Sequence, residues 1–96
     1  MIKHVVMFKF KPEAAADERR DAINDLGQLP NKIAIIRQFE IGEDVLHSPR
    51  SWGLSLVSTF DDLDALQTYL DHDDHVAVAL RLRAMCDAIA VVDSEQ

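Results

Sequence analysis

Four segments of this chain alternate apolar and polar residues with a period of two, and two segments with helical spacing lie between them. The alternating segments, which predict β-strands, span residues 2–10, 33–41, 52–60 and 88–93. The helical segments span residues 13–29 and 62–86, and an acidic cluster at residues 71–74 interrupts the second one. The βαββαβ order predicts an α+β fold, a four-stranded antiparallel sheet with its helices on one face. A chain of 96 residues suffices for one such domain, so residues 1–96 are expected to form a single domain.

The predicted strands carry apolar side chains on both faces, whereas the helices can cover only one face of the sheet. The apolar residues in the register that points away from the helices are Val5, Met7, Ile36, Val57 and Val92. A contiguous apolar patch on a globular domain indicates an interface. A second copy would present the same patch, so we expect a homodimer in which two sheets close into a barrel.

Charge and composition exclude several classes of partner. Ten Lys and Arg residues against seventeen Asp and Glu residues give a formal net charge of -7, which disfavours binding to nucleic acid. No segment approaches the roughly 20 apolar residues of a membrane span, and charged residues interrupt every apolar run near the N-terminus before a signal sequence forms. A single cysteine, Cys86, forms no internal disulfide. These features predict a cytoplasmic protein with no nucleic-acid or membrane partner.

Four short motifs occur in order along nearly the whole chain. They are IKHVVMFKFK at residues 2–11, STFD at residues 58–61, YLDHDDHV at residues 69–76 and VVD at residues 91–93. Together they resemble the stress-responsive dimeric α/β-barrel (Dabb) family. The resemblance implies a ferredoxin-like protomer that pairs into a dimeric α+β barrel. It also implies that many bacterial members have no assigned reaction, whereas a plant branch includes polyketide cyclases that use a His and a Tyr, without a cofactor, to close a ring.

His75 and Tyr69 are the residues that correspond to this cyclase pair. His75 shares a helical stripe with Val78, Leu82 and Ile89, so its imidazole is expected to face the sheet. Tyr69 precedes the acidic break, where a chain reversal would bring its hydroxyl near the same cavity. A neutral His is suited to remove a proton next to a carbonyl, and in the resembling cyclases the Tyr steadies the oxyanion. The alternative is a histidine bonded within the core and a tyrosine that packs on the sheet.

Asp93 is a candidate third member of the catalytic set. It ends the last predicted strand, and His4 begins the first, so antiparallel pairing of these strands would place the two side by side. Asp93 is therefore able to reach either His4 or His75 and to fix the tautomer of that ring. The alternative is a solvated carboxylate near the end of the strand.

A ligand cavity is expected between the helices and the sheet. Besides the three candidate catalytic residues, its expected lining is His4, Val6, Phe8, Leu54, Leu56, Val78, Leu82 and Ile89. Two functions fit: binding of a small hydrophobic or carbonyl-containing molecule, with cofactor-free acid-base chemistry, or a non-catalytic, stress-associated structural or assembly dimer.

Neither a cofactor nor a metal is expected. Asp73 and Asp74 are explained by the dipole at a helix start, without an ion. Three positions depart from the resembling proteins: Leu54 stands where the cyclase branch carries a further His, Cys86 stands where that branch has a large aromatic residue, and Asp73 replaces the Pro that is usual in the family. These departures argue against an aromatic polyketide as the substrate.

Overall fold

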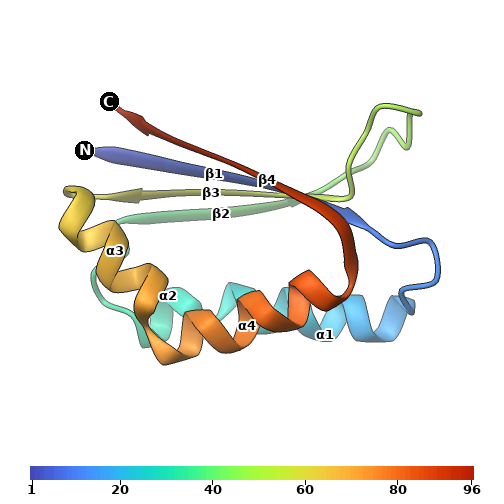
Figure 1. Ribbon diagram of the computed structural model, residues 1–96, viewed down its shortest axis with the longest axis horizontal. Helices are drawn as coiled ribbons and strands as arrows, with labels where there is room; N and C mark the ends of the chain where they lie inside the picture. Colours follow the sequence, from blue (N-terminus) through green and yellow to red (C-terminus); the bar gives the residue numbers. More distant parts are fainter.

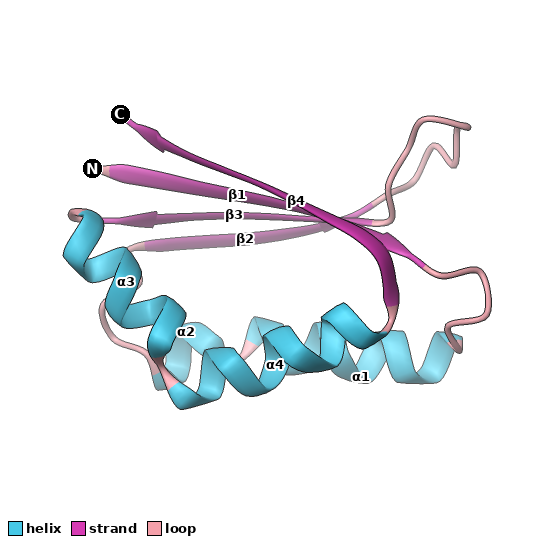
Figure 2. Ribbon diagram, in the orientation of Figure 1, coloured by secondary structure: helices cyan, strands magenta, loops and turns pink.

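The computed structural model describes all of residues 1–96 and consists of two layers, a sheet and a layer of helices (Figure 1). The elements in chain order are β1 (Ile2–Phe10), α1 (Ala16–Gly27), α2 (Leu29–Lys32), β2 (Gln38–Glu43), β3 (Leu54–Phe60), α3 (Leu63–Asp71), α4 (Asp73–Ala84) and β4 (Cys86–Glu95). Figure 2 shows all four helices on the same face of the sheet. The predicted fold class, a ferredoxin-like α+β domain, is confirmed.

The sheet has the strand order β2-β3-β1-β4, and every neighbouring pair is antiparallel. β1 is therefore a central strand, which pairs with β3 on one side and with β4 on the other. In this register His4 faces Asp93 across the β1 and β4 pair, and Val6 faces Val91. The first and last strands of the fold thus lie side by side (Figure 1).

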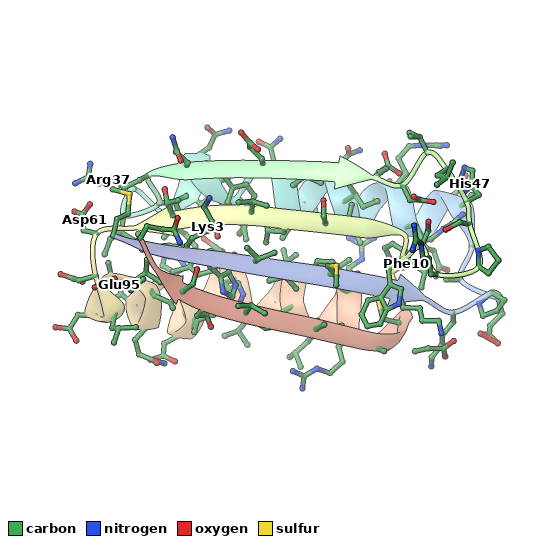
Figure 3. The ribbon with its side chains drawn as sticks, turned by 90° about the horizontal axis from the view of Figure 1, so that it is seen from above. Lys3, Phe10, Arg37, His47, Asp61 and Glu95 are labelled. Carbon is green, nitrogen blue, oxygen red and sulfur yellow. The ribbon has the colours of Figure 1, made fainter.

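Several element boundaries differ from the sequence-based prediction. The alternating segment 33–41 is a strand only from Gln38, because Ile33 ends the short helix α2 and donates its backbone N–H to the Leu29 carbonyl at 2.8 Å. Residues 33–37 form a loop whose first side chain, Ile33, is buried in the core. The guanidinium of Arg37 binds both carboxylate oxygens of Asp61 at 2.8 and 2.9 Å, which ties this loop to the turn after β3 (Figure 3). Apolar alternation in this segment therefore reflects loop packing rather than strand pairing.

The remaining boundaries shift in either direction. The first helix begins at Ala16 rather than at residue 13, and β3 begins at Leu54 rather than at residue 52. β4 is longer than the predicted 88–93, since it pairs with β1 along its whole length, from Phe10 opposite Cys86 to Ile2 opposite Glu95. The predicted interruption of the second helical segment falls at His72, whose Nδ1 accepts the Asp74 N–H at 3.1 Å and caps α4.

The core lies between the helices and the inner face of the sheet. Its largest fully buried side chains are Tyr69, Phe60, Leu29, Leu54, Leu56 and Leu82.

No helix of the chain combines the length and the apolar character that crossing a bilayer requires.

The outer face of the sheet is uncovered, and Figure 3 looks directly onto it. Val5 lies there between Val57 and Val92 in register, and Met7 is 45% exposed. The prediction of an apolar outer face on all four strands is wrong for β2. Ile36 precedes that strand, and β2 presents polar positions such as Glu40, which is paired with Val57. The apolar patch therefore covers β1, β3 and β4 only.

The start of α3 depends on a side-chain cap that can be tested. The carboxylate of Asp62 accepts the backbone N–H of Ala65 at 2.8 Å. We expect Asp62→Ala to lower the free energy of unfolding by about 1 kcal/mol, because an N–H group of the first turn loses its acceptor. Asp62→Asn, which keeps an acceptor oxygen, should retain most of the stability in urea denaturation. An alanine variant as stable as the parent would show that the cap contributes nothing.

Candidate functional site

A cavity of about 190 Å³ lies between the inner face of the sheet and the helices. It is lined by His4, Val6, Phe8, Leu26, Leu56, Tyr69, Leu70, His75, Ala79, Leu82, Arg83, Ile89 and Val91. Ten of these thirteen residues are hydrophobic, so the few polar groups have well-defined positions in an apolar surrounding. Such a lining is typical of small-molecule sites, in which a small number of polar atoms orient the ligand.

His75 lies in the first turn of α4 and is half-buried. Its Nδ1 lies 2.9 Å from the carbonyl oxygen of Leu70, in the last turn of α3, and donates to it because a carbonyl can only accept. Burial lowers the pKa of His75 below its ordinary value; the bond to Leu70 opposes this shift, and the nearby His4 and His72 add to it. The ring is therefore neutral at pH 7, and Nε2 carries the lone pair that can accept a proton.

Tyr69 forms the wall of the cavity next to His75. Its side chain is fully buried, and its ring centroid lies 4.4 Å from that of His75 and 4.9 Å from that of Phe60. The hydroxyl is buried and has no hydrogen-bond partner in the protein. Burial raises the pKa of this phenol well above its ordinary value, so Tyr69 remains a hydrogen-bond donor at all physiological pH values. The site thus holds an unused donor beside a neutral imidazole.

His4 and Asp93 form a second polar pair at the cavity. The two residues face each other in the β1 and β4 register, and His4 Nδ1 is bonded to the Asp93 carboxylate. His4 is buried, and its ring centroid lies 6.1 Å from that of Tyr69. The sequence left His4 and His75 as the two possible partners of Asp93. In the structure Asp93 is bonded to His4, whereas His75 donates to the Leu70 carbonyl.

Most of the residues predicted to line a cavity lie around this one. His4, Val6, Phe8, Leu56, Tyr69, His75, Leu82 and Ile89 border it. Leu54 and Val78 are buried in the core without bordering it, and Asp93 touches it only through His4.

Five lining residues were not predicted: Leu26, Leu70, Ala79, Arg83 and Val91. Ala79 and Arg83 follow His75 at successive intervals of four, and Val91 follows Ile89 at an interval of two, so regular periodicity would have identified them. Leu70 becomes part of the wall only through the angle between α3 and α4, for which the sequence carries no pattern.

The acidic segment that precedes His75 has a structural role. His72 caps α4 through its Nδ1, and no group of three or more His, Cys, Asp or Glu side chains is placed to hold a metal ion. Cys86 is buried, and burial raises the pKa of its thiol, which keeps it in the less reactive protonated form.

The sheet order, the helical layer and the interior cavity define a ferredoxin-like domain with a largely apolar cavity between its sheet and its helices. The chain belongs to the stress responsive A/B barrel domain (Dabb) family, whose sequence profile matches residues 2–96. The family predicted from the sequence motifs is thereby confirmed.

Similar proteins agree with this assignment. An uncharacterized protein of Streptomyces coelicolor is 32% identical over 79 residues, which are 80% of this chain and 81% of that protein. The olivetolic acid cyclase of Cannabis sativa is 23% identical over 94 residues, 96% of this chain and 93% of the cyclase. A dimeric ferredoxin-like protein of unknown function from Bacteroides fragilis has a TM-score of 0.82 and 33% identity, covering 99% of this chain and 95% of the other.

The lowered pKa of His75 gives a direct prediction. In a histidine NMR titration, the His75 resonance should have its midpoint below 6.5, the ordinary value. Because the unfolded chain binds this proton at higher pH than the folded chain, the contribution of His75 to stability should be lost as the pH falls below about 6.5. The parent should therefore lose more stability between pH 7.5 and 5.5 than His75→Asn. A midpoint above 6.5 would contradict the burial described here.

Proposed function

We propose that the cavity binds a small carbonyl-containing molecule and that His75 and Tyr69 transfer protons on it without a cofactor. The observation that carries the proposal is the unpartnered, buried hydroxyl of Tyr69 beside a neutral His75. A buried hydroxyl without a partner costs roughly 1–3 kcal/mol, so its retention favours a role toward a ligand. The 23% identity to a cyclase over nearly the whole chain supports the same class of chemistry.

The proposed chemistry begins with removal of a proton from the carbon next to a carbonyl. His75 Nε2 accepts that proton, the C–H electron pair forms a C=C bond to the carbonyl carbon, and the carbonyl π pair moves to the oxygen, which gives an enolate. The Tyr69 hydroxyl donates a hydrogen bond to the enolate oxygen, which stabilises the charge where it develops. In a ligand that carries a second ketone or ester carbonyl within reach, the enolate carbon attacks that carbonyl, and the His75 imidazolium returns the proton to the new alkoxide. In a ligand without one, the imidazolium returns the proton to the enolate.

The roles of His4 and Asp93 follow from their pairing. His4 borders the cavity, and its bond to Asp93 fixes the ring so that Nε2 is the free nitrogen. We assign Asp93 as a positioning residue that acts through His4, since it contacts the cavity only in this way. In this arrangement Asp93 does not assist His75 directly.

The size of the cavity restricts the ligand. Its volume of about 190 Å³ is below the roughly 300–1,000 Å³ of sites for drug-sized molecules. The hydrophobic lining favours an apolar ligand with one or two carbonyl groups. Short keto acids and their esters fit this description better than a fused aromatic polyketide.

We propose further that the protein is a homodimer joined through the outer face of the sheet. Met7 and Val92 are 45% and 64% exposed on this face, and Val5 lies between Val57 and Val92 in register. Burying this patch against a second copy removes it from water, and a specific interface of this kind buries more than about 1,200 Å² in total. The dimeric state of the Bacteroides fragilis protein, at 33% identity, supports the proposal.

Tyr69→Phe separates a functional tyrosine from a structural one. Because the hydroxyl has no partner, we expect its removal to leave the free energy of unfolding unchanged or to raise it by up to about 1 kcal/mol. In a thermal-shift screen against small β-keto acids, the parent should gain roughly 2.7 kcal/mol at 100 times the dissociation constant, and Tyr69→Phe and His75→Ala should lose most of this gain. If both variants instead lose stability while ligand responses are absent or unchanged, the chain is a non-catalytic dimer.

The dimer is tested by a charge on the outer face. Met7→Glu would place an unpaired carboxylate in the interface, so this variant should sediment as a 10.8 kDa monomer at micromolar concentration, where the parent sediments at about twice that mass. Leu80→Glu is the matched control, because Leu80 is 60% exposed on α4, on the opposite side of the molecule. A dimeric Met7→Glu variant would refute the proposed interface.

A further inference from the structure

A second, larger cavity lies at the end of the sheet where β1 ends. It has a volume of about 420 Å³ and opens between α1 and the loop that joins β2 to β3. Figure 3 shows Phe10 and His47, which both border it, at this end of the sheet. It shares no residue with the cavity that contains His75. The proposed proton-transfer chemistry therefore does not explain it.

Arg19 is the most unusual residue of this cavity. Its Nε is buried and has no hydrogen-bond acceptor in the protein, and the guanidinium forms no ion pair with any carboxylate of the chain. The guanidinium carbon lies 5.7 Å from the centroid of the Phe10 ring, a distance at which a cation and an aromatic face attract each other. The planar fork of arginine donors matches a carboxylate. An acceptor from outside the chain would satisfy the buried N–H group.

The charges around the cavity restrict that acceptor to a monoanion. Two arginines, Arg19 and Arg20, are balanced by Glu43 and Asp44. The Asp44 carboxylate is already engaged, since it accepts the His47 backbone N–H at 2.8 Å. Because the formal charges of the lining cancel and the whole chain carries a formal charge of -7, a polyanion such as a phosphate ester would be repelled.

The remaining walls favour an aromatic body on the ligand. Phe10, Trp52 and Ile23 supply the apolar surface of the cavity. Gly53 allows the Phe10 ring to lie against the start of β3, because a Cβ at this position would be 2.8 Å from Phe10 Cδ2. Aromatic rings pack well on such surfaces in offset or edge-to-face arrangements.

We propose that this cavity is a binding site for a small aromatic monocarboxylate. Arg19 binds the carboxylate with its unpartnered donors, and the rings of Phe10 and Trp52 contact the aromatic body. The site is separate from the His75 cavity in position and in ligand chemistry, so the two can be tested independently.

Trp52 provides a local reporter, because it is the single tryptophan of the chain and borders only the second of the two cavities. We expect titration with phenylacetate to change the Trp52 fluorescence in a saturable manner. The neutral analogue 2-phenylethanol should bind at least about ten-fold more weakly, because it lacks the charge that Arg19 recognises. The affinity for phenylacetate should also fall with added salt.

Two matched variants locate the anion contact. Arg19→Gln should weaken phenylacetate binding by about ten-fold or more, whereas Arg83→Gln, which alters an arginine at the His75 cavity, should leave it unchanged. Circular dichroism checks folding, and if Arg19→Gln does not fold, Arg19→Lys serves instead. The lysine keeps the charge but lacks the planar fork of the guanidinium, so this variant should still bind phenylacetate more weakly than the parent.

Three results would overturn the proposal. They are the absence of a fluorescence response, equal binding of phenylacetate and 2-phenylethanol, and weaker phenylacetate binding by Arg83→Gln but not by the Arg19 variant. None of these results bears on ligand responses that depend on Tyr69 and His75.

Discussion

The pairing of β1 with β4 is the interaction on which the rest of this structure depends. It joins the two ends of the fold from Ile2 opposite Glu95 to Phe10 opposite Cys86, and it makes β1 a central strand. The same register places His4 against Asp93 and brings Ile89 and Val91 to the wall of the inner cavity. Without this pairing the sheet would lose its edge strand β4, and the cavity would be open to water on the side that Ile89 and Val91 now close.

The two cavities use buried polar groups in the same way. Tyr69 and Arg19 each keep a donor out of contact with water and without a partner in the protein, an arrangement that reduces folding stability. Natural domains retain few such groups, and those that remain often belong to sites whose ligand completes the bonding. The two proposed sites differ in the groups beside these donors: a neutral imidazole lies next to Tyr69, whereas a balanced set of charges surrounds Arg19.

The sequence predicted what local periodicity encodes and missed what depends on the packing of distant segments. The sequence predicts β1 and β3 correctly because their alternating residues pair with neighbouring strands. Residues 33–37 alternate in the same way, yet they form a loop in which Ile33 is buried in the core. The inward position of His75 followed from its helical stripe. Its bond to Leu70 did not, because that bond depends on how α3 meets α4. Arg19 was not recognised, since one inward arginine cannot be distinguished within a charged helix.

The central position of β1 also has a kinetic consequence. Its partners, β3 and β4, lie about half a chain and nearly a full chain further along the sequence, so few of its contacts are local. Folds dominated by such distant pairings form slowly, because the entropy of closing long loops is lost before the contacts are gained. During synthesis the apolar β1 segment leaves the ribosome with both edges unpaired and must wait for the last strand. This interval is the stage at which the chain is most exposed to aggregation and most suited to protection by a chaperone.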